Sequence, residues 1–429
     1  MKFPERIWRF LVNLRPVPLA VLIFSIALLV RLAFMIIFRP YENLGRLELE
    51  RVAISLATTG VYGNPYALPT GPTAHVSPGY TLLLAGLFHL FGTGISGEIV
   101  KELLTSTVTS FQCASLPLVA SGLSLDRRAG ILAGLVSAIY PVKPLVQIDG
   151  DWETPYTAIF LMLLSVITAQ LWRKRAASTR SALLHGVSWG VALLFVSALL
   201  PMFLIFLAVG AYIWRGIPFR SYLRFAAMEL LVVALFLAPW AIRNYYALGS
   251  PILTRSNFGL EMRISNNDLA TPSERANDTK GLYQIYHPLQ NPSEALKVRQ
   301  MGEVAYNKKA LEEAEQWIRT HPTRFLRLSL GRIGWFWLFI DRTSWMKTLF
   351  LDVTVFLGFA GLLYVFRADR MTGTVLALIL LLYPLPNYLI HLGLRQKYPI
   401  DWLMTLLSAV VIVSWWMPRV FPRDTPAQY

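Results

Sequence analysis

Apolar segments recur along almost the whole of this chain of 429 residues. Each is about 20 residues long, enough to cross the ~30 Å hydrocarbon core of a bilayer as an α-helix. No water reaches that core to satisfy backbone N–H and C=O groups, so a crossing segment must be a helix or a strand of a closed barrel. Barrel strands are short and alternate between apolar and polar residues. The pattern therefore predicts an all-α protein that crosses the membrane many times.

The composition agrees with a membrane protein and argues against a nucleic-acid partner. Charged residues make up 15% of the chain and hydrophobic residues 55%, whereas a soluble domain carries about 25% charged residues. The net charge is +15, which in a soluble protein would suggest nucleic acid. Here the basic residues lie mostly between apolar segments, as expected for cytoplasmic loops and for contact with anionic membrane lipids. The single cysteine, Cys113, excludes an intramolecular disulfide and a cysteine-based metal site.

The basic residues also predict the orientation of the chain. Four of them precede the first apolar segment and place the N-terminus in the cytoplasm: Lys2, Arg6, Arg9 and Arg15. If later basic clusters also stay inside, the chain crosses the membrane ten times and both termini are cytoplasmic. The predicted spans are 17–38, 102–123, 129–146, 154–172, two within 183–214 that meet near Pro201, 225–240, 349–366, 375–392 and 402–417.

Two hydrophilic parts are expected on the outer side of the membrane. The first begins with an amphipathic helix at 45–60, continues through a loop rich in Pro, Gly and Thr at 64–78, and ends in an interfacial helix at 79–91 that is too short to span. The second runs from 243 to about 327 and contains a solvated helical stretch at 292–320. We therefore expect an N-terminal transmembrane module, an outer loop with an interfacial helix, and C-terminal transmembrane helices with a short cytoplasmic tail, at 1–240, 241–345 and 346–429.

One apolar segment, 324–340, contains Arg327 and Arg332. A span at this place would move Arg367 and Arg370 to the outer side and invert every later segment. We therefore interpret 324–340 as an interfacial helix.

Acidic residues gather in the predicted outer segments, close to the membrane. They are Glu42, Glu48 and Glu50 around the first amphipathic helix, and Asp149, Asp151 and Glu153 in the sequence IDGDWETPY before the fourth span. Carboxylates near hydrocarbon are costly unless they are solvated, paired or used in chemistry. One of them is a candidate general base that activates an acceptor hydroxyl. The alternative is that they are solvated loop residues.

Basic residues on the same side run against the usual charge bias. They are Lys143, Arg243, Arg395 and Lys397, the last two within HLGLRQKYPID. A lipid phosphate would account for them, because Arg and Lys bind phosphate oxygens through charge-assisted hydrogen bonds. Snorkelling at the membrane edge is the alternative. Arg31 lies deeper, within the first span, and we interpret it as a structural residue paired with an acid or a carbonyl.

The histidines give a weaker signal. His75 in the outer loop and His391 beside Arg395 are candidate substrate-binding residues. His287 and His321 lie in the hydrophilic part with no spacing that indicates a metal site. The chain has no HExxH, GxGxxG or P-loop pattern, which argues against a zinc protease, a dinucleotide enzyme and an ATPase.

Five stretches, taken in order, resemble a bacterial GT-C glycosyltransferase of the protein-O-mannosyltransferase-like group, which includes the lipid A aminoarabinose transferase. ELERVAISLATTGVYGNPY and TGPTAHVSPGYTLLLAGLFHLFG resemble the first outer loop of that group. APWAIRNYYALGSPI, HPTRFLRLSLGRIGWFW and RQKYPIDWLMTLLSA resemble the exit from a middle span, the lead into the later spans and an element before the last span. The resemblance implies a GT-C-like bundle with interfacial helices and an outer hydrophilic loop.

The resemblance also implies a reaction and its partners. The donor would be a sugar on a polyprenyl phosphate, and the acceptor a lipid or glycan on the periplasmic face of a bacterial inner membrane. Glu48 falls at the acidic position of the first outer loop, with Arg51 one turn later, and Glu153 matches a second acidic position. Glu48 and Glu153 are our candidate catalytic residues. Arg51, and Tyr80 of the Pro-Gly-Tyr element, are candidate substrate-binding residues. No cofactor is expected to be obligatory, although a divalent cation is possible.

Some positions depart from the pattern of that group. Many members have Asp where this chain has Glu48. A basic residue that often precedes the proline between the fifth and sixth spans is missing from SALLPMF, and the closing element reads Arg-Gln-Lys in place of Arg-Tyr-Arg.

Three functions stay open at this point. The first is an inverting transferase of hexosyl or pentosyl groups. The second is a transporter or flippase of a lipid-linked saccharide, which predicts charged groups near the bilayer midplane and inverted repeats; the sequence shows neither clearly. The third is a saccharide ligase that uses a lipid diphosphate donor.

Overall fold

The computed structural model describes residues 3–42, 46–140, 152–175, 177–338, 345–390 and 394–416. These residues form helices, and they contain no strand beyond one isolated bridge between Gly63 and Pro72. The prediction of an all-α protein is therefore confirmed.

Seven helices of the described residues are long and apolar enough to cross a membrane. They are α2 (Pro16–Phe38), α5 (Ile95–Gly122), α8 (Thr154–Lys174), α11 (Phe219–Leu248), α18 (Trp345–Ala368), α19 (Arg370–Leu382) with the short α20 (Leu385–Leu389), and α21 (Leu394–Val411). Three shorter helices occupy the remaining predicted spans: α6 (Arg127–Ile139), α9 (Thr179–Phe195) and α10 (Leu200–Ile213). A 3-10 turn at Ser197–Leu199 separates α9 from α10, close to the predicted break at Pro201.

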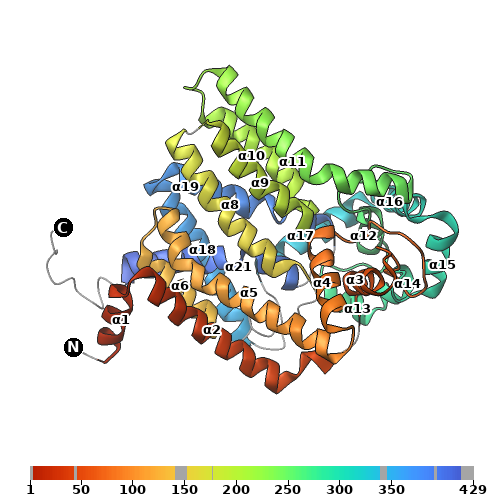
Figure 1. Cartoon of the computed structure of the whole chain (residues 1–429), viewed down its shortest axis with the longest axis horizontal. Coiled ribbons are helices and arrows are strands. Elements are labelled where there is room, and N and C mark those ends of the chain that lie inside the picture. Colours follow the sequence, from red (N-terminus) through yellow and green to blue (C-terminus); the bar gives the residue numbers. More distant parts are fainter. Residues whose placement is uncertain are drawn as a thin grey trace.

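The hydrophilic parts gather at one end of this bundle. Figure 1 shows α3 (Glu48–Thr59) and α4 (Pro78–Phe91) beside α12 (Phe258–Ser265) and α16 (Glu303–Thr320), far from both chain termini. α13 (Glu274–Thr279), α14 (Leu282–Tyr286), α15 (Pro292–Met301) and α17 (Pro322–Trp337) complete the larger hydrophilic part. At the other end lies the amphipathic α1 (Phe3–Asn13).

The helical stretch predicted at 292–320 is two helices, α15 and α16, and not one. They are separated at Gly302, whose φ of 82° lies in the left-handed region that favours glycine. The turn ends α15 with a hydrogen bond from Gly302 N to Val298 O. It also allows α16 to begin in a new direction and bring Glu303 against the loop before α4.

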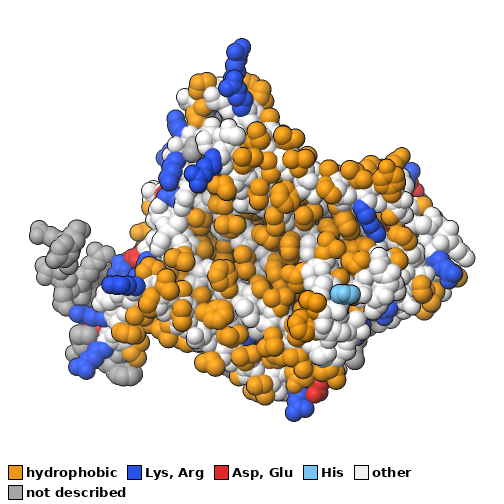
Figure 2. All heavy atoms as spheres, in the orientation of Figure 1, with side chains coloured by type: hydrophobic (Ala, Val, Ile, Leu, Met, Phe, Trp, Pro, Cys, Tyr) orange, Lys and Arg blue, Asp and Glu red, His pale blue; other side chains and the backbone are white. Residues whose placement is uncertain are grey.

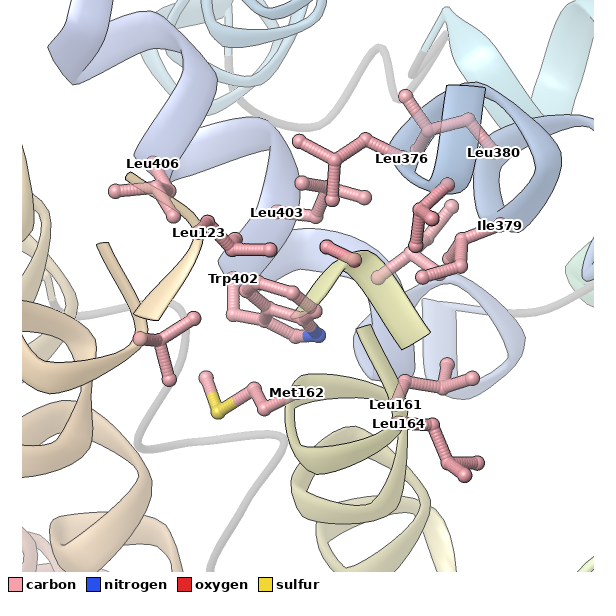
Figure 3. Close-up of a cluster of buried hydrophobic side chains, with 14 of the residues drawn as sticks. Leu123, Leu161, Met162, Leu164, Leu376, Ile379, Leu380, Trp402, Leu403 and Leu406 are labelled. Atoms are coloured by element: carbon pink, nitrogen blue, oxygen red, sulfur yellow. The ribbon is translucent and has the colours of Figure 1, made fainter. Parts of the chain in front are cut away.

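The bundle is held by an apolar core that most of the membrane helices share. Trp402 of α21 is fully buried and lies between Met162 of α8 and residues of α19 such as Ile379 (Figure 3). At Gly361 a Cβ atom would stand 2.2 Å from the Leu407 carbonyl oxygen, so only glycine permits this approach of α18 to α21. On the outside, hydrophobic side chains cover the middle of the face seen in Figure 2, and charged side chains lie mainly toward its edges.

Arg31 of α2 is buried in this bundle and has carbonyl partners, as expected. Its Nε donates to Thr109 Oγ1 (2.8 Å), and an Nη donates to the Ala27 carbonyl (2.9 Å). A further contact joins it to Cys113 Sγ at 3.4 Å. These bonds tie α2 to α5 and support a structural role.

Candidate functional site

Glu48 stands at the first position of α3 and is 6% exposed. Leu49, Val52 and Ala53 of the same helix pack into an apolar cluster with α4, and this packing fixes the start of α3. An acidic side chain in the first turn also interacts favourably with the helix dipole. The amphipathic pattern of the sequence therefore leads directly to a buried carboxylate at the end of the bundle.

Two histidines from distant parts of the chain meet this carboxylate. His287, which follows α14, has Nε2 at 3.1 Å from Glu48 Oε1. His75, in the loop before α4, is equally buried, and one ligand atom from each of the three residues lies within 4.8 Å of the others. Sequence reasoning missed His287, because it has no spacing relation to the other two.

Neighbouring groups favour particular protonation states at these histidines. Burial lowers the pKa of His75 well below its usual value, and the electrostatic effects of Arg255 and His287 lower it further. The ring is therefore neutral. His75 Nδ1 is hydrogen-bonded to the Tyr66 hydroxyl at 2.9 Å. His287 Nδ1 accepts a hydrogen bond from the backbone N–H of Leu289 (3.1 Å). A neutral His287 ring therefore carries its proton on Nε2, the atom that faces Glu48.

These three side chains are also a candidate site for a divalent cation, because carboxylate and imidazole are common metal ligands. Tyr66 would act as an outer partner that orients His75, in the tautomer whose Nδ1–H donates to the tyrosine oxygen. A cation bound to His287 Nε2 would require the other tautomer, with the proton on Nδ1, and the hydrogen bond from the Leu289 N–H would then be lost.

Three charged side chains fix the loop that carries His75. Glu303 accepts hydrogen bonds from Thr73 Oγ1, from the backbone N–H of Ala74 (2.8 Å) and from Ser256 Oγ (2.5 Å). Arg255 Nε donates to the His75 carbonyl at 3.0 Å. Sequence reasoning selected neither Glu303 nor Arg255, since each works through tertiary contacts.

The third of these charged residues, Arg243, was predicted to bind phosphate. Its guanidinium donates to the carbonyls of Thr73 (2.6 Å) and Tyr62 (2.7 Å) and to Asn244 Oδ1 (2.9 Å). This use of its donors favours a structural role for Arg243.

The second acidic candidate, Glu153, lies near the first site. Arg255 connects the two, because one Nη is 3.8 Å from Glu153 Oε1 while Nε holds the His75 carbonyl. Next to Glu153, the Trp152 ring has the Arg395 guanidinium 3.7 Å from its centroid. Arg255 therefore links the loop that carries His75 to Glu153, and Arg395 lies over the residue next to Glu153.

The remaining candidates divide into three groups. Tyr80 is buried in the apolar cluster of α3 and α4, 5.0 Å from the Tyr156 ring, and Arg51 donates to the Tyr66 carbonyl at 3.2 Å, so both support the local structure. Lys397 is buried in α21, in a separate cavity that also contains Tyr140 and Asp401. Lys143, Asp149, Asp151 and His391 lie outside the described residues.

The fold that holds this site is a GT-C-like, all-α, polytopic membrane fold. Two solved structures similar to the chain are of an archaeal oligosaccharyltransferase from Archaeoglobus fulgidus. One, AglB in complex with an inhibitory peptide and a dolichol-phosphate, has a TM-score of 0.53 and 14% identity over 96% of this chain and 53% of that one. The other, tethered to an acceptor peptide with the NVT sequon by a disulfide bond, has the same score and identity over 92% and 49%.

This chain thus spans about half the length of the structures it matches. At 14% identity the likeness establishes the fold alone. No protein-family model matches the chain, and neither does any curated protein sequence.

Proposed function

We propose that this chain is an integral-membrane glycosyltransferase that moves a sugar from a polyprenyl-phosphate donor to an acceptor hydroxyl. The observation that carries the proposal is the buried Glu48 carboxylate, which faces His287 and His75 and lies in the region of Glu153 and Arg395. The GT-C-like fold supports it, because one similar structure holds a dolichol-phosphate. By analogy, the site lies on the outer face of a bacterial inner membrane and the acceptor is a lipid or glycan.

In the proposed reaction Glu48 takes the proton of the acceptor hydroxyl. The acceptor oxygen bonds to the anomeric carbon of the sugar as the bond from that carbon to the phosphate oxygen breaks. The electron pair leaves with the polyprenyl phosphate, and in-line attack inverts the anomeric centre. Arg395, which lies over Trp152 next to Glu153, stabilises the charge of the leaving phosphate. His287, whose Nε2–H faces Glu48, and His75 with Tyr66 orient the base.

The test is the Glu48→Gln variant, assayed as purified protein with a polyprenyl-phosphate sugar donor. Gln keeps the size of the side chain but cannot take a proton, so we expect sugar transfer to fall by about 10²-fold or more. Glu312→Gln is the matched control, because Glu312 is an exposed residue of α16. If Glu48→Gln transfers sugar at the wild-type rate, Glu48 is not the base.

Three expectations from the sequence are part of this proposal. The chain is divided at 1–240, 241–345 and 346–429, the transferred group is a hexose or pentose, and a cation at Glu48, His75 and His287 is not obligatory.

A further inference from the structure

The amphipathic helix α1 exposes part of its apolar surface. Leu11 is buried in an apolar cluster with residues of α2, α5 and α6, and Trp8 and Val12 pack partly against that cluster. Ile7 and Phe10 are three residues apart, so they share a face of the helix. They are 44% and 61% exposed. The residues that the structure describes therefore leave this face of α1 uncovered.

Arg127 fixes α1 to the rest of the bundle. From the start of α6, its guanidinium donates to the carbonyls of Val12 (3.2 Å) and Leu14 (2.7 Å). The last carbonyls of a helix lack partners within the helix, and a cation at this end also interacts favourably with the helix dipole. The exposed face of α1 consequently has a defined place on the surface of the molecule.

That place is beside a helix that is long and apolar enough to cross a membrane. α1 ends at Asn13 and α2 begins at Pro16, and the chain turns sharply between them (Figure 1). The first turns of α2 expose Val17 (72%) and Val21 (58%). In a bilayer these valines face hydrocarbon, so α1 lies where the headgroups meet the acyl chains. Basic amphipathic helices that carry Trp, Phe and Leu on their apolar face lie in this plane.

Arginines outnumber carboxylates around α1. The helix, its link to α2 and the start of α6 together contain five arginines and two carboxylates. Glu5 pairs with Arg9 at 2.9 Å. Asp126, the N-cap of α6, pairs with Arg128 at 2.6 Å. Each carboxylate is thus neutralised by an arginine of its own segment.

Arg6 and Arg15 have no such partner. Both residues are exposed, and no carboxylate of the described residues pairs with either of them. Arg6 is four residues before Phe10, so the two side chains are neighbours on the surface of α1. Arg15 comes two residues before Val17. Two free cations therefore lie next to apolar side chains that face the membrane.

We propose that α1 binds anionic phospholipids, with their headgroups at Arg6 and Arg15 and their acyl chains over Ile7 and Phe10. The leaflet is the one opposite the candidate site, because α1 lies at the other end of the bundle (Figure 1). A phospholipid offers an anion and a hydrocarbon chain in one molecule, as this surface requires. The position of α1 beside the membrane-facing part of α2 favours a lipid over a soluble acidic partner. The proposal does not depend on sugar transfer.

The first experiment measures the depth of α1 in the membrane. Phe10→Cys is labelled with a fluorophore in the full chain, in nanodiscs of phosphatidylglycerol and phosphatidylcholine. The native Cys113 is buried, which directs the label to the introduced thiol. We expect doxyl-labelled lipids to quench this probe at least about twofold more than a probe in Asn13→Cys. Asn13 is the matched control, because it is exposed on the polar face of the same helix.

The second experiment measures the lipid preference at the same probe. Doxyl-labelled phosphatidylglycerol should quench the Phe10→Cys probe more than doxyl-labelled phosphatidylcholine at the same mole fraction. An arginine close to an anionic surface strengthens binding about fivefold, so Arg6→Gln with Arg15→Gln should lower the apparent affinity for phosphatidylglycerol by about tenfold or more. Arg6→Lys with Arg15→Lys keeps both charges and should keep the preference.

A matched pair of variants separates this site from general attraction of basic residues to the membrane. Arg220→Gln with Arg224→Gln removes two exposed arginines of α11, on the side of the membrane where α1 is expected. This pair should leave the preference at the Phe10→Cys probe unchanged. An equal loss in both pairs overturns the proposal. It is also overturned if soluble iodide, and not doxyl-labelled lipid, quenches the Phe10→Cys probe, since this face of α1 would then contact water.

Discussion

Removing the Glu303 carboxylate should loosen the loop segment 73–75 that carries His75. Glu303 is buried at the start of α16 and accepts hydrogen bonds from Thr73, Ala74 and Ser256. Thr73 in turn accepts a hydrogen bond from the backbone N–H of His75 at 2.9 Å. Glu303 therefore connects the hydrophilic part of the molecule to the candidate site.

The expected magnitude follows from these three bonds. Hydrogen bonds to a charged group contribute about 1.5–3 kcal/mol each, but burying a carboxylate costs several kcal/mol. In Glu303→Ala the Ala74 N–H loses its acceptor and a cavity remains, so we expect a loss of about 3–5 kcal/mol in the free energy of unfolding. In Glu303→Gln one oxygen still accepts from Ala74 and Ser256, and we expect a loss below about 1.5 kcal/mol.

The pH dependence gives a second, independent readout. Burial raises the pKa of Glu303, although hydrogen bonds from Ser256, Thr73 and Ala74 oppose the shift. The folded state then holds this proton more tightly than the unfolded state. The resulting stability is complete below the unfolded-state pKa, about 4.3, and is lost as the pH rises through the folded-state pKa. Glu303→Gln lacks this loss. Its free energy of unfolding should therefore increase relative to that of the wild type as the pH rises.

The assay is equilibrium unfolding of the purified protein in mixed micelles at several pH values, followed by circular dichroism. The reasoning is refuted if Glu303→Ala loses less than about 1 kcal/mol, or if Glu303→Gln shows the same pH slope as the wild type.

Three other predictions follow from single observations. In Gly259→Ala the new Cβ would stand 1.9 Å from the Asn307 carbonyl oxygen. Thermal unfolding should therefore show a loss of about 3 kcal/mol in the free energy of unfolding. Gly86→Ala, which has open space at its Cβ, should leave the stability unchanged. Zn²⁺ should bind at Glu48, His75 and His287 in calorimetry of the purified protein, and His287→Ala should abolish the binding. A cysteine at the exposed Lys308 should react with an impermeant maleimide from the outer side; labelling from the cytoplasm would invert the orientation.

Local patterns in the sequence predict much of the fold. The apolar face of the first amphipathic helix and the short apolar segment after it give α3 and α4 nearly at their observed ends. Arg31, predicted to pair within the bundle, has carbonyl and hydroxyl partners from α2 and α5. Even the break at Gly302 has a local cause, because glycine is the residue that adopts a positive φ without strain.

The site is less predictable because its members meet only through tertiary packing. Glu48 follows from the amphipathic helix, but His287 reaches it from a hydrophilic segment more than 200 residues later. Arg255 contacts the His75 carbonyl and forms a long ion pair with Glu153. The sequence around Arg255 contains no pattern that predicts either contact. Charge in the sequence also does not separate structural from ligand-binding cations, as Arg243 shows by donating to two backbone carbonyls.

The contacts of a basic residue in the folded protein distinguish a structural cation from a ligand-binding one. Two buried lysines illustrate the difference. Lys101 of α5 contacts Glu50 and has Glu98 at 2.8 Å, so its charge is neutralised by the chain itself and ties α3 to α5. Lys397 is buried to a similar degree, yet its hydrogen bond is to a carbonyl at 3.5 Å. A buried ammonium keeps its charge only if something compensates it. For Lys101 the compensation comes from carboxylates in direct contact, whereas the carboxylates that act on Lys397, Asp401 and Asp352, do so without a direct ion pair.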